Sequence, residues 1–456
     1  MKYFVIFFFS TYCLFGQTIK GKIIDAETKT PLENVSVYFK NLKKGTTTNR
    51  KGFYNLKIDS DFYSLDTLTV SIIGYYPQNL VLSELKKNDF TINLYKKTEQ
   101  LKEITLLTNR KLKKEIRFRK LSSLRRGVHS FDSKLIDDKI YLIGGDGSYL
   151  EDTGKKALLE VQNLPKSNFS DLLKRLVLNP TWENYKDDLL VYNITNDDWI
   201  KSDLKFRERA YHNTNLINNK LYVIGGKRLS INKKKEYLDD TIEVYNIKND
   251  RIIIDQTNPH QGVNFASFSY NNNLIVMGGS IKMNKNGEKI YTDKSHIYNV
   301  ESGYWYELKN MTATKEVKGV IIENMIYLFG GFNGSPLTEI ETYNITTGDW
   351  DNEGELFSGI KNPALAYSDN IIYILGNSKI LTYNIITKTL NEYDINLKLE
   401  ASRMHFYKNK LYIIGGYTEN EYSRTPSSNL FRIDIDEFET TEVVKSKSFS
   451  QKLISN

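Results

Sequence analysis

A short run of apolar residues that ends at glycine, in five copies at a pair of glycines, occurs six times along the chain. The copies lie at residues 139–145, 221–226, 274–279, 326–331, 372–377 and 411–416. Runs of this length, rich in Ile, Leu, Val and Tyr and ended by glycine, are typical of buried β-strands. Because six copies of one pattern indicate a repeat, the repeat decides the fold.

Each copy is followed by a second pattern, in which a Tyr-Asn pair precedes a large apolar residue by a constant interval. The tyrosines are Tyr192, Tyr245, Tyr298, Tyr343 and Tyr383, with Phe431-Arg432 as a degraded sixth pair, and seven residues later stand Trp199, Ile252, Trp305, Trp350, Leu390 and Phe438. A constant interval through a turn predicts a hairpin of fixed register. We therefore expect four strands in each unit, in the first at residues 129–136, 139–145, 189–194 and from Trp199 onward.

The tyrosine or phenylalanine markers are 53, 53, 45, 40 and 48 residues apart. Four strands at a period of about 50 residues are typical of a propeller blade. The glycine pair, the Tyr-Asn pair and the tryptophan together resemble the kelch repeat, and this resemblance implies a six-bladed propeller over residues 127–446. In the fifth, weakest unit Gly376-Asn377 replaces the glycine pair, and asparagine tolerates the left-handed region better than most residues.

Ten glycines form the complete pairs, and we expect them to be structural, because glycine allows positive φ and close approach where blades converge. They are Gly144, Gly145, Gly225, Gly226, Gly278, Gly279, Gly330, Gly331, Gly415 and Gly416.

Residues 18–107 show short alternating runs separated by turn residues, which predicts a small β-sandwich. The segment resembles the carboxypeptidase-regulatory-like, or prealbumin-like, domain at the front of many Bacteroidetes outer-membrane receptors and secreted proteins. The resemblance rests on Gly21, Asp25, Pro31-Leu32, Val35, Gly45-Thr46, Gly52-Phe53, Gly74-Tyr75 and residues 101–104. It implies a non-catalytic accessory domain. The fold class expected for the whole chain is therefore all-β.

Residues 1–17 have a charged start, a short apolar centre and a small residue near the end, which is typical of a secretory signal peptide. We expect an exported protein, located in the periplasm, on the outer-membrane surface or outside the cell, with no transmembrane segment. Cys13 is the only cysteine. Because it falls inside this segment, disulfides, thiolate catalysis and cysteine metal ligands are not expected.

The formal charge of +8 is concentrated in a basic segment, in which residues 110–126 hold nine Lys and Arg against Glu115. We interpret residues 108–126 as a solvated linker; attraction to an acidic surface is the alternative. Residues 447–456 form a C-terminal tail. We expect ring closure by packing of the first blade on the sixth, unless the tail exchanges a strand.

Loops of unequal length are the informative feature of a propeller, because its ligands bind at loops. Residues 146–188 form a long insertion in the first unit, with a short helix expected at residues 169–176 and Ser170 as its cap. The helix is expected either to cover the channel or the sandwich, or to pack on its own blade.

Two later loops carry basic residues, Lys227, Arg228 and Lys282, which are candidates for binding an anionic ligand. The alternative is that these loops are solvated hairpin tips. Arg403 and His405 are further candidates for ligand binding. Arg126 and His129, and likewise Arg209 and His212, share an Arg-x-x-His spacing. These four residues are the catalytic candidates if the protein is an enzyme, although Arg-x-x-His also belongs to the kelch pattern, where it is structural.

Metal and cofactor sites are not expected. The five histidines fall on separate units with no close pair, and neither a phosphate-binding loop nor a nucleophile elbow is present. The copper site of galactose oxidase, another kelch protein, needs a cysteine that the exported chain would lack. The basic segment has no interleaved aromatic residues, so nucleic acid is not an expected partner.

The hypothesis that these features favour is a monomeric, non-catalytic binding or scaffolding protein of the bacterial cell envelope. Its propeller loops would recognise a glycan or a protein partner. The alternative is a sugar-acid mutarotase similar to the periplasmic six-bladed kelch enzymes that act on sialic acid, an isomerase using Arg and His in the channel. Fold alone does not decide between them.

Overall fold

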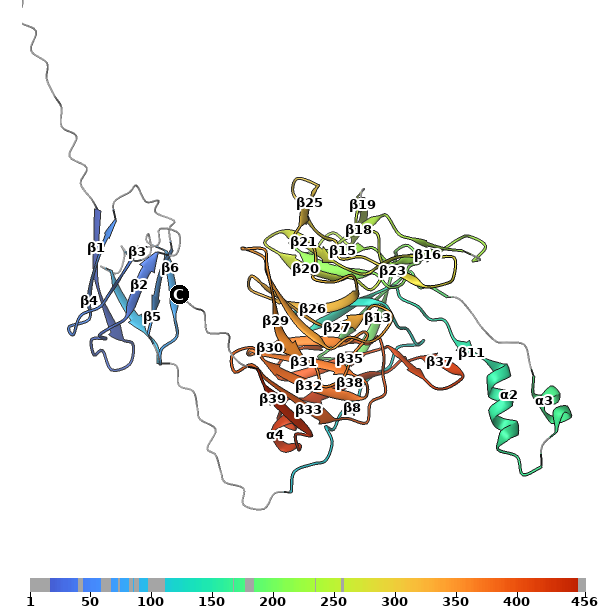
Figure 1. Ribbon diagram of the computed structural model, residues 1–456. Helices are drawn as coiled ribbons and strands as arrows, with labels where there is room; N and C mark the ends of the chain where they lie inside the picture. Colours follow the sequence, from blue (N-terminus) through green and yellow to red (C-terminus); the bar gives the residue numbers. More distant parts are fainter. Residues whose placement is uncertain are drawn as a thin grey trace, which may run out of the picture. The chain divides into compact units, whose positions relative to one another are not determined.

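The protein consists of two compact units, Met1–Arg110 and Lys111–Asn456 (Figure 1). The computed structural model describes residues 17–39, 44–58, 67–72, 74–81, 85, 90–96, 111–166, 168–176, 184–233, 235–255 and 258–449. All but the last residue of the predicted signal peptide lie outside these ranges.

The first unit is a β-sandwich of two small sheets, as the alternating pattern predicts. One sheet has the order β4 (Phe53–Ile58), β1 (Gln17–Asp25), β7 (Thr91–Leu94), and the other β3 (Lys44–Thr47), β2 (Ser36–Phe39), β5 (Thr67–Ser71), β6 (Gln78–Val81). Apolar side chains such as Ile23, Val37 and Val70 are buried between them. The Asp25 carboxylate accepts a hydrogen bond from the Tyr75 hydroxyl at 2.8 Å, so two residues of the family pattern fix each other.

Each of the six sequence repeats forms one larger antiparallel sheet, a blade, of the second unit. In order from the innermost strand outward, the first three blades are β9 (Asp132–Ile136), β10 (Lys139–Ile143), β12 (Asp188–Asn193) and β13 (Asp198–Lys205); β14 (Asn213–Ile217), β15 (Lys220–Ile224), β18 (Ile242–Asn246) and β19 (Arg251–Asp255); and β20 (Ala266–Tyr270), β21 (Asn273–Met277), β24 (Ser295–Asn299) and β25 (Tyr304–Leu308). The other three are β26 (Glu316–Ile322), β27 (Met325–Phe332), β28 (Glu339–Asn344) and β29 (Asp349–Glu355); β30 (Ala364–Ser368), β31 (Ile371–Gly376), β32 (Lys379–Asn384) and β33 (Thr389–Asp394); and β34 (Arg403–Phe406), β35 (Lys410–Ile414) and β38 (Leu430–Asp434) with a strand from elsewhere. Each innermost strand contacts those of both neighbouring blades, and β34 contacts β9, so the ring is closed.

The second sequence pattern determines the outer half of each blade. Tyr192 pairs with Trp199 across the hairpin, and the equivalent residues pair in the next four blades. The rings of Tyr298 and Trp305 lie 4.8 Å apart. The asparagine after each tyrosine, for example Asn193, accepts hydrogen bonds from two amides of the following turn. The predicted register is therefore confirmed in five blades.

The glycine pairs lie where neighbouring blades approach. Gly144 has φ 60°, and a Cβ there would be 2.9 Å from the carbonyl oxygen of Arg209 in the next blade. All ten pair glycines have positive φ, which confirms the conformation predicted for them. In the fifth blade Asn377 and Ser378, with φ 53° and 57°, form a two-residue turn between β31 and β32 at the place of the glycine pair.

The first blade packs on the sixth, as expected, and both ends of the unit also add strands to other blades, so the strand exchange left open for the tail occurs as well. The outermost strand of the sixth blade is β8 (Arg119–Lys120), which pairs with β38, while β39 (Lys445–Ser448) adds a fifth strand to the fifth blade. From residue 111 onward the predicted linker therefore belongs to the propeller. Phe438 lies in helix α4 (Asp436–Thr440), not in an outer strand, because the chain leaves the sheet after β38.

The insertion of the first blade contains two helices, α2 (Thr153–Gln162) and α3 (Phe169–Arg175), which contact each other. The cap of α3 is Asn168 and not Ser170, since the Asn168 side chain accepts from the Asp171 amide. Strand β11 (Leu150–Glu151) ties the insertion to a hairpin of the sixth blade, β36 (Tyr417–Glu419) and β37 (Ser423–Pro426) (Figure 1). No helix in the described ranges is long and apolar enough to cross a membrane.

Candidate ligand-binding site

A cavity of about 820 Å³ lies at one end of the propeller channel; we call it the loop pocket. Hairpins between the second and third strands of three blades form its walls: β16 (Lys227–Leu229) with β17 (Glu236–Leu238), β22 (Ser280–Met283) with β23 (Lys289–Tyr291), and β36 with β37. These hairpins are extensions of loops that a minimal blade does not need, as the two-residue turn of the fifth blade shows.

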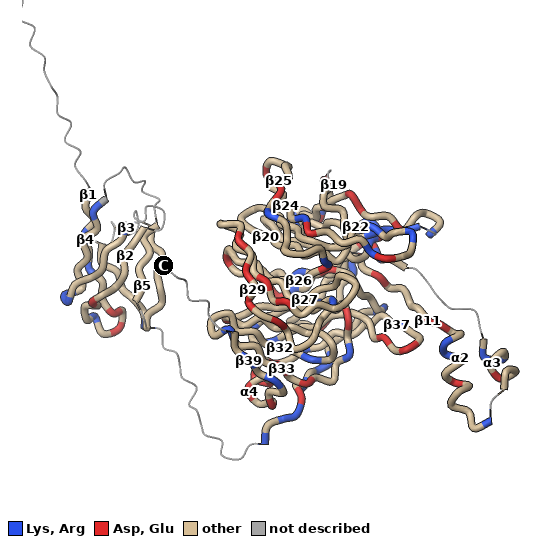
Figure 2. The backbone as a smooth tube through the Cα atoms, in the orientation of Figure 1, with Lys and Arg blue, Asp and Glu red and all other residues tan. Residues whose placement is uncertain are grey.

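Positive charge dominates the loop pocket. Six cationic side chains line it, Lys227, Arg228, Lys282, Lys289, Lys361 and Arg424, against two carboxylates, Glu236 and Glu400. Figure 2 shows Lys and Arg gathered around β22. Three of the cations have carboxylate partners: Lys227 with Glu236, Lys289 with Glu316 and Arg424 with Glu419.

The other three cations of the loop pocket, Arg228, Lys282 and Lys361, form no ion pair with any described residue. The buried Nε atoms of Arg228 and Arg424 also lack hydrogen-bond partners in the described part of the chain. An anion entering the pocket would therefore meet donors that are still available.

The floor of the loop pocket has unusual backbone geometry. Ser130, Tyr211, Asn264 and Ala401 precede the innermost strands of four blades, line the pocket and all have φ between 50° and 62°. The Tyr211 amide donates to the Ser130 carbonyl at 2.7 Å, and the Asn264 amide donates to the Tyr211 carbonyl at 3.4 Å. These bonds join successive blades and hold the floor in a conformation that is costly for residues with a Cβ.

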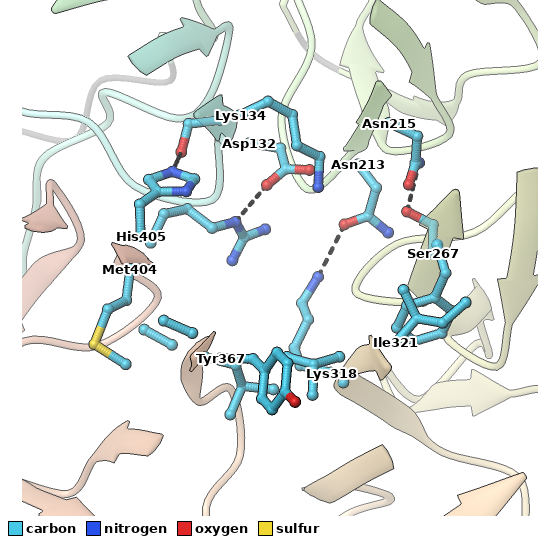
Figure 3. A pocket seen from close by; sticks show the side chains of 18 of the residues that line it. Asp132, Lys134, Asn213, Asn215, Ser267, Lys318, Ile321, Tyr367, Met404 and His405 are labelled. Carbon is cyan, nitrogen blue, oxygen red and sulfur yellow. Dashed lines mark hydrogen bonds and ion pairs between the residues drawn. The ribbon is translucent and has the colours of Figure 1, made fainter. Parts of the chain in front are cut away.

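Arg403 and His405 lie elsewhere, in a second cavity of about 410 Å³ that we call the channel pocket (Figure 3). The innermost strands of all six blades line it, and it shares no lining residue with the loop pocket. Arg403 pairs with Asp132 at 2.7 Å, and the His405 ring is 2.8 Å from the Ser133 hydroxyl. The five ligand candidates from the sequence are thus divided between two cavities.

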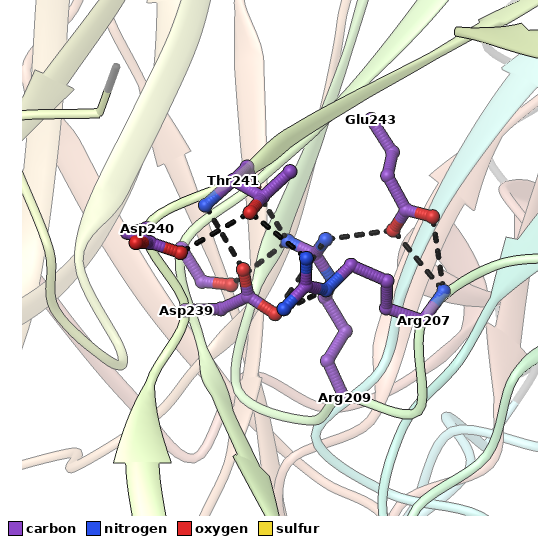
Figure 4. A network of polar contacts seen from close by, with 7 residues as sticks. Arg207, Arg209, Asp239, Asp240, Thr241 and Glu243 are labelled. Atoms are coloured by element: carbon purple, nitrogen blue, oxygen red, sulfur yellow. Dashed lines mark hydrogen bonds and ion pairs between the residues drawn. The ribbon is translucent and has the colours of Figure 1, made fainter. Parts of the chain in front are cut away.

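The catalytic candidates line neither pocket. Arg209 is fully buried and forms an ion pair with Glu243 at 2.6 Å, while its Nη1 donates to the Thr241 carbonyl (Figure 4). Burial raises the pKa of the Glu243 carboxyl, although Arg209 opposes the shift. Asp239 lies 3.7 Å from Arg209 and 3.2 Å from Arg207. This network joins the second blade internally, which is a structural role.

The histidines of the Arg-x-x-His pairs are also enclosed. His212 is fully buried. His129 is 2% exposed, and its ring lies 5.0 Å from that of Tyr417, which lines the loop pocket. Arg126 is exposed outside both cavities. No pattern along the chain indicated that His260 and His296 meet, yet their Nδ1 atoms are 2.9 Å apart, so the expectation of no close histidine pair was wrong. Among the described residues no group of three or more His, Cys, Asp or Glu could hold a metal ion.

Replacing Arg209 with methionine should lower the free energy of unfolding of the propeller by about 3–5 kcal/mol, because Glu243 would remain buried without its partner. All four tryptophans lie between residues 182 and 350, so tryptophan fluorescence during urea unfolding reports on this unit. The double variant R209M/E243M should regain part of the loss. A single variant within about 1 kcal/mol of the wild type would contradict the structural role of the pair.

Comparisons with known proteins identify the class of each unit. The CarboxypepD_reg-like domain model matches residues 19–106, and the Kelch motif model matches residues 314–356, which span the fourth blade. The protein is therefore an all-β chain in which a CarboxypepD_reg-like domain precedes a kelch propeller.

Curated kelch proteins are similar to this chain at low identity. Kelch repeat and BTB domain-containing protein 2 of cowpox virus is 24% identical, over 48% of this chain and 38% of its own length. Human Kelch-like protein 15 is 27% identical, over 35% of this chain and 28% of its own. The chain thus spans less than half the length of these relatives. Among solved structures, YjhT aligns with a TM-score of 0.49 and 12% identity, over 67% of this chain and 96% of that one.

Several lining residues of the loop pocket had no signal in the sequence. Lys361, Glu400 and Arg424 are far apart along the chain and follow no repeat-specific pattern. The useful signal was the unequal loop length, which pointed to Lys227, Arg228 and Lys282, and these three residues do line the loop pocket.

Proposed function

We propose that the propeller is a binding module that holds an anionic carbohydrate, a sugar bearing a carboxylate, in the loop pocket. The observation that carries this proposal is the convergence of six cations and two carboxylates on one cavity of about 820 Å³. A general binding or scaffolding role is consistent with the kelch matches; the class of ligand is our inference.

Charge and aromatic surface together support a sugar acid over a simple inorganic anion. Tyr211, Tyr237 and Tyr417 line the same cavity, and tyrosine offers both an apolar ring face and a hydroxyl to a polyhydroxylated ring. Arg228 already lies over the Tyr237 ring at 5.3 Å, and Arg424 over the Tyr417 ring at 4.6 Å. These contacts hold the guanidinium groups in place before a ligand arrives.

The mutarotase alternative has less support from the geometry, because the four residues suggested for it line neither pocket. A carboxyl group in the loop pocket suited to proton transfer is Glu400, whose pKa is raised by burial. We therefore give binding as the conclusion.

Calorimetric titration with galacturonate and galactose tests the proposal, since these sugars differ in the carboxylate alone. We expect galacturonate to bind at least about tenfold more tightly than galactose, because a charge-assisted hydrogen bond contributes roughly 1.5–3 kcal/mol. The R228M and R424M variants should each remove most of this preference. The matched control is K408M, which changes an exposed lysine in the turn between β34 and β35. Equal binding of both sugars, or an equal loss in K408M, would contradict the proposal.

A further inference from the structure

The channel pocket contains a lysine that neither the repeat nor the proposed function uses. Lys318, on the innermost strand of the fourth blade, extends into this cavity toward Asn213 (Figure 3). Its amine donates hydrogen bonds to two neutral oxygens, the Asn213 side-chain carbonyl at 3.1 Å and the Phe265 main-chain carbonyl at 3.2 Å. No described carboxylate forms an ion pair with it.

The surrounding charges leave the cavity with excess positive charge. Lys134, Lys318 and Arg403 line it together with Asp132. That aspartate is already used, because it accepts from the Nε of Arg403 at 2.7 Å and from the Thr214 amide at 2.5 Å. His405 adds no charge near neutral pH, since burial lowers its pKa to about 3.

Enclosure and neighbouring cations both act on the Lys318 amine. Burial in the channel, then the charge of Arg403, lowers its pKa to about 7, while Asp132 and Glu316 oppose this shift and Lys134 adds to it. A substantial fraction of the amine is therefore uncharged at neutral pH, the state in which lysine acts as a nucleophile.

We propose that the channel pocket captures a small carbonyl compound bearing a carboxylate, with Lys318 as the nucleophile that forms a Schiff base. The uncharged amine attacks the carbonyl carbon to form a carbinolamine. The carbinolamine then loses the former carbonyl oxygen and the two original amine protons as one molecule of water, and a C=N bond remains. The reaction is therefore balanced, needs no further reactant and is reversible. The guanidinium of Arg403 and the ammonium of Lys134 supply the charge that the ligand carboxylate requires. A cavity of about 410 Å³ accommodates a compound of this size.

Reductive trapping tests this proposal on the full chain. Glyoxylate and cyanoborohydride are added at pH 7.5, and carboxymethyl-lysine is then located by peptide mass spectrometry. We expect Lys318 to be modified at least about tenfold faster than exposed Lys408, because burial lowers the pKa of the Lys318 amine to about 7. The rate at Lys318 should level off above about pH 7, where its amine has lost the proton. The K318R variant should lose the fast modification.

Acetaldehyde, which lacks a carboxylate, is the matched probe for the anion-binding part of the proposal. It should modify Lys318 more slowly than glyoxylate, and K134M should reduce this difference. Modification of Lys318 no faster than Lys408 would overturn the Schiff-base proposal. If Lys318 and Lys408 showed the same preference for glyoxylate over acetaldehyde, the role assigned to Arg403 and Lys134 would be overturned. These outcomes do not depend on sugar binding in the loop pocket.

Discussion

Deleting residues 1–126 should destabilise the propeller by more than about 5 kcal/mol, whereas deleting residues 1–110 should leave its stability unchanged. The difference lies in residues 111–126, which supply β8 and two apolar side chains that are at most 5% exposed, Ile116 and Leu124. Loss of one such side chain alone typically costs about 2–5 kcal/mol.

Other contacts of this segment would be lost with it. The Phe118 ring packs on Phe431 at 5.1 Å, and the Trp199 indole donates to the Ser122 carbonyl at 2.9 Å. The longer deletion would also expose the unpaired edge of β38, which promotes association. Urea unfolding followed by tryptophan fluorescence, with sedimentation to detect association, measures both effects. If the two deletions prove equally stable, β8 does not close the ring.

Acidification from pH 7 to pH 5 should destabilise the propeller by at least about 4 kcal/mol. Burial lowers the pKa of His129 and His260 to about 4, and that of His212 and His405 to about 3. In the unfolded chain histidine has a pKa of about 6.5, so below that pH the unfolded state binds more protons than the folded state. Stability is therefore complete above about pH 6.5 and is lost as the pH falls toward the folded-state values.

Each histidine contributes about 2 kcal/mol to the loss of unfolding free energy between pH 7 and pH 5. Glu243 and Glu400 have raised pKa values and oppose this loss. Carboxyl groups with lowered pKa, such as Asp188, matter only below about pH 4. Urea unfolding at several pH values between 5 and 7 gives the slope. The H405Q variant should reduce it by about one proton. A stability that is flat over this range would refute the idea that these histidines are buried in the neutral form.

Much of the fold was predictable because its repeat is local. The apolar run, the glycine pair and the Tyr-Asn pair act within one blade, through strand pairing, positive φ and a capped turn. Ring closure was not predictable in this way. β8 and β38 are about 310 residues apart, and a two-residue strand of Arg119 and Lys120 carries no hydrophobic signal. The basic composition that suggested a solvated linker is equally suited to an exposed edge strand.

The candidate site was likewise predictable only in part. Loop lengths pointed to Lys227, Arg228 and Lys282, which line the loop pocket. The Arg-x-x-His spacing suggested catalytic candidates, but two of them, Arg209 and His212, are enclosed within the wall of the ring.

The sequence by itself determined the class of fold, the number of blades and the register of the outer hairpins in five of them, since the repeated patterns involve residues a few positions apart. The tertiary structure alone decided how the ring closes, that Lys361, Glu400 and Arg424 meet the predicted basic loops, and that Lys318 extends into a second cavity. These features depend on side chains brought together from different blades, and closure of the ring sets those distances.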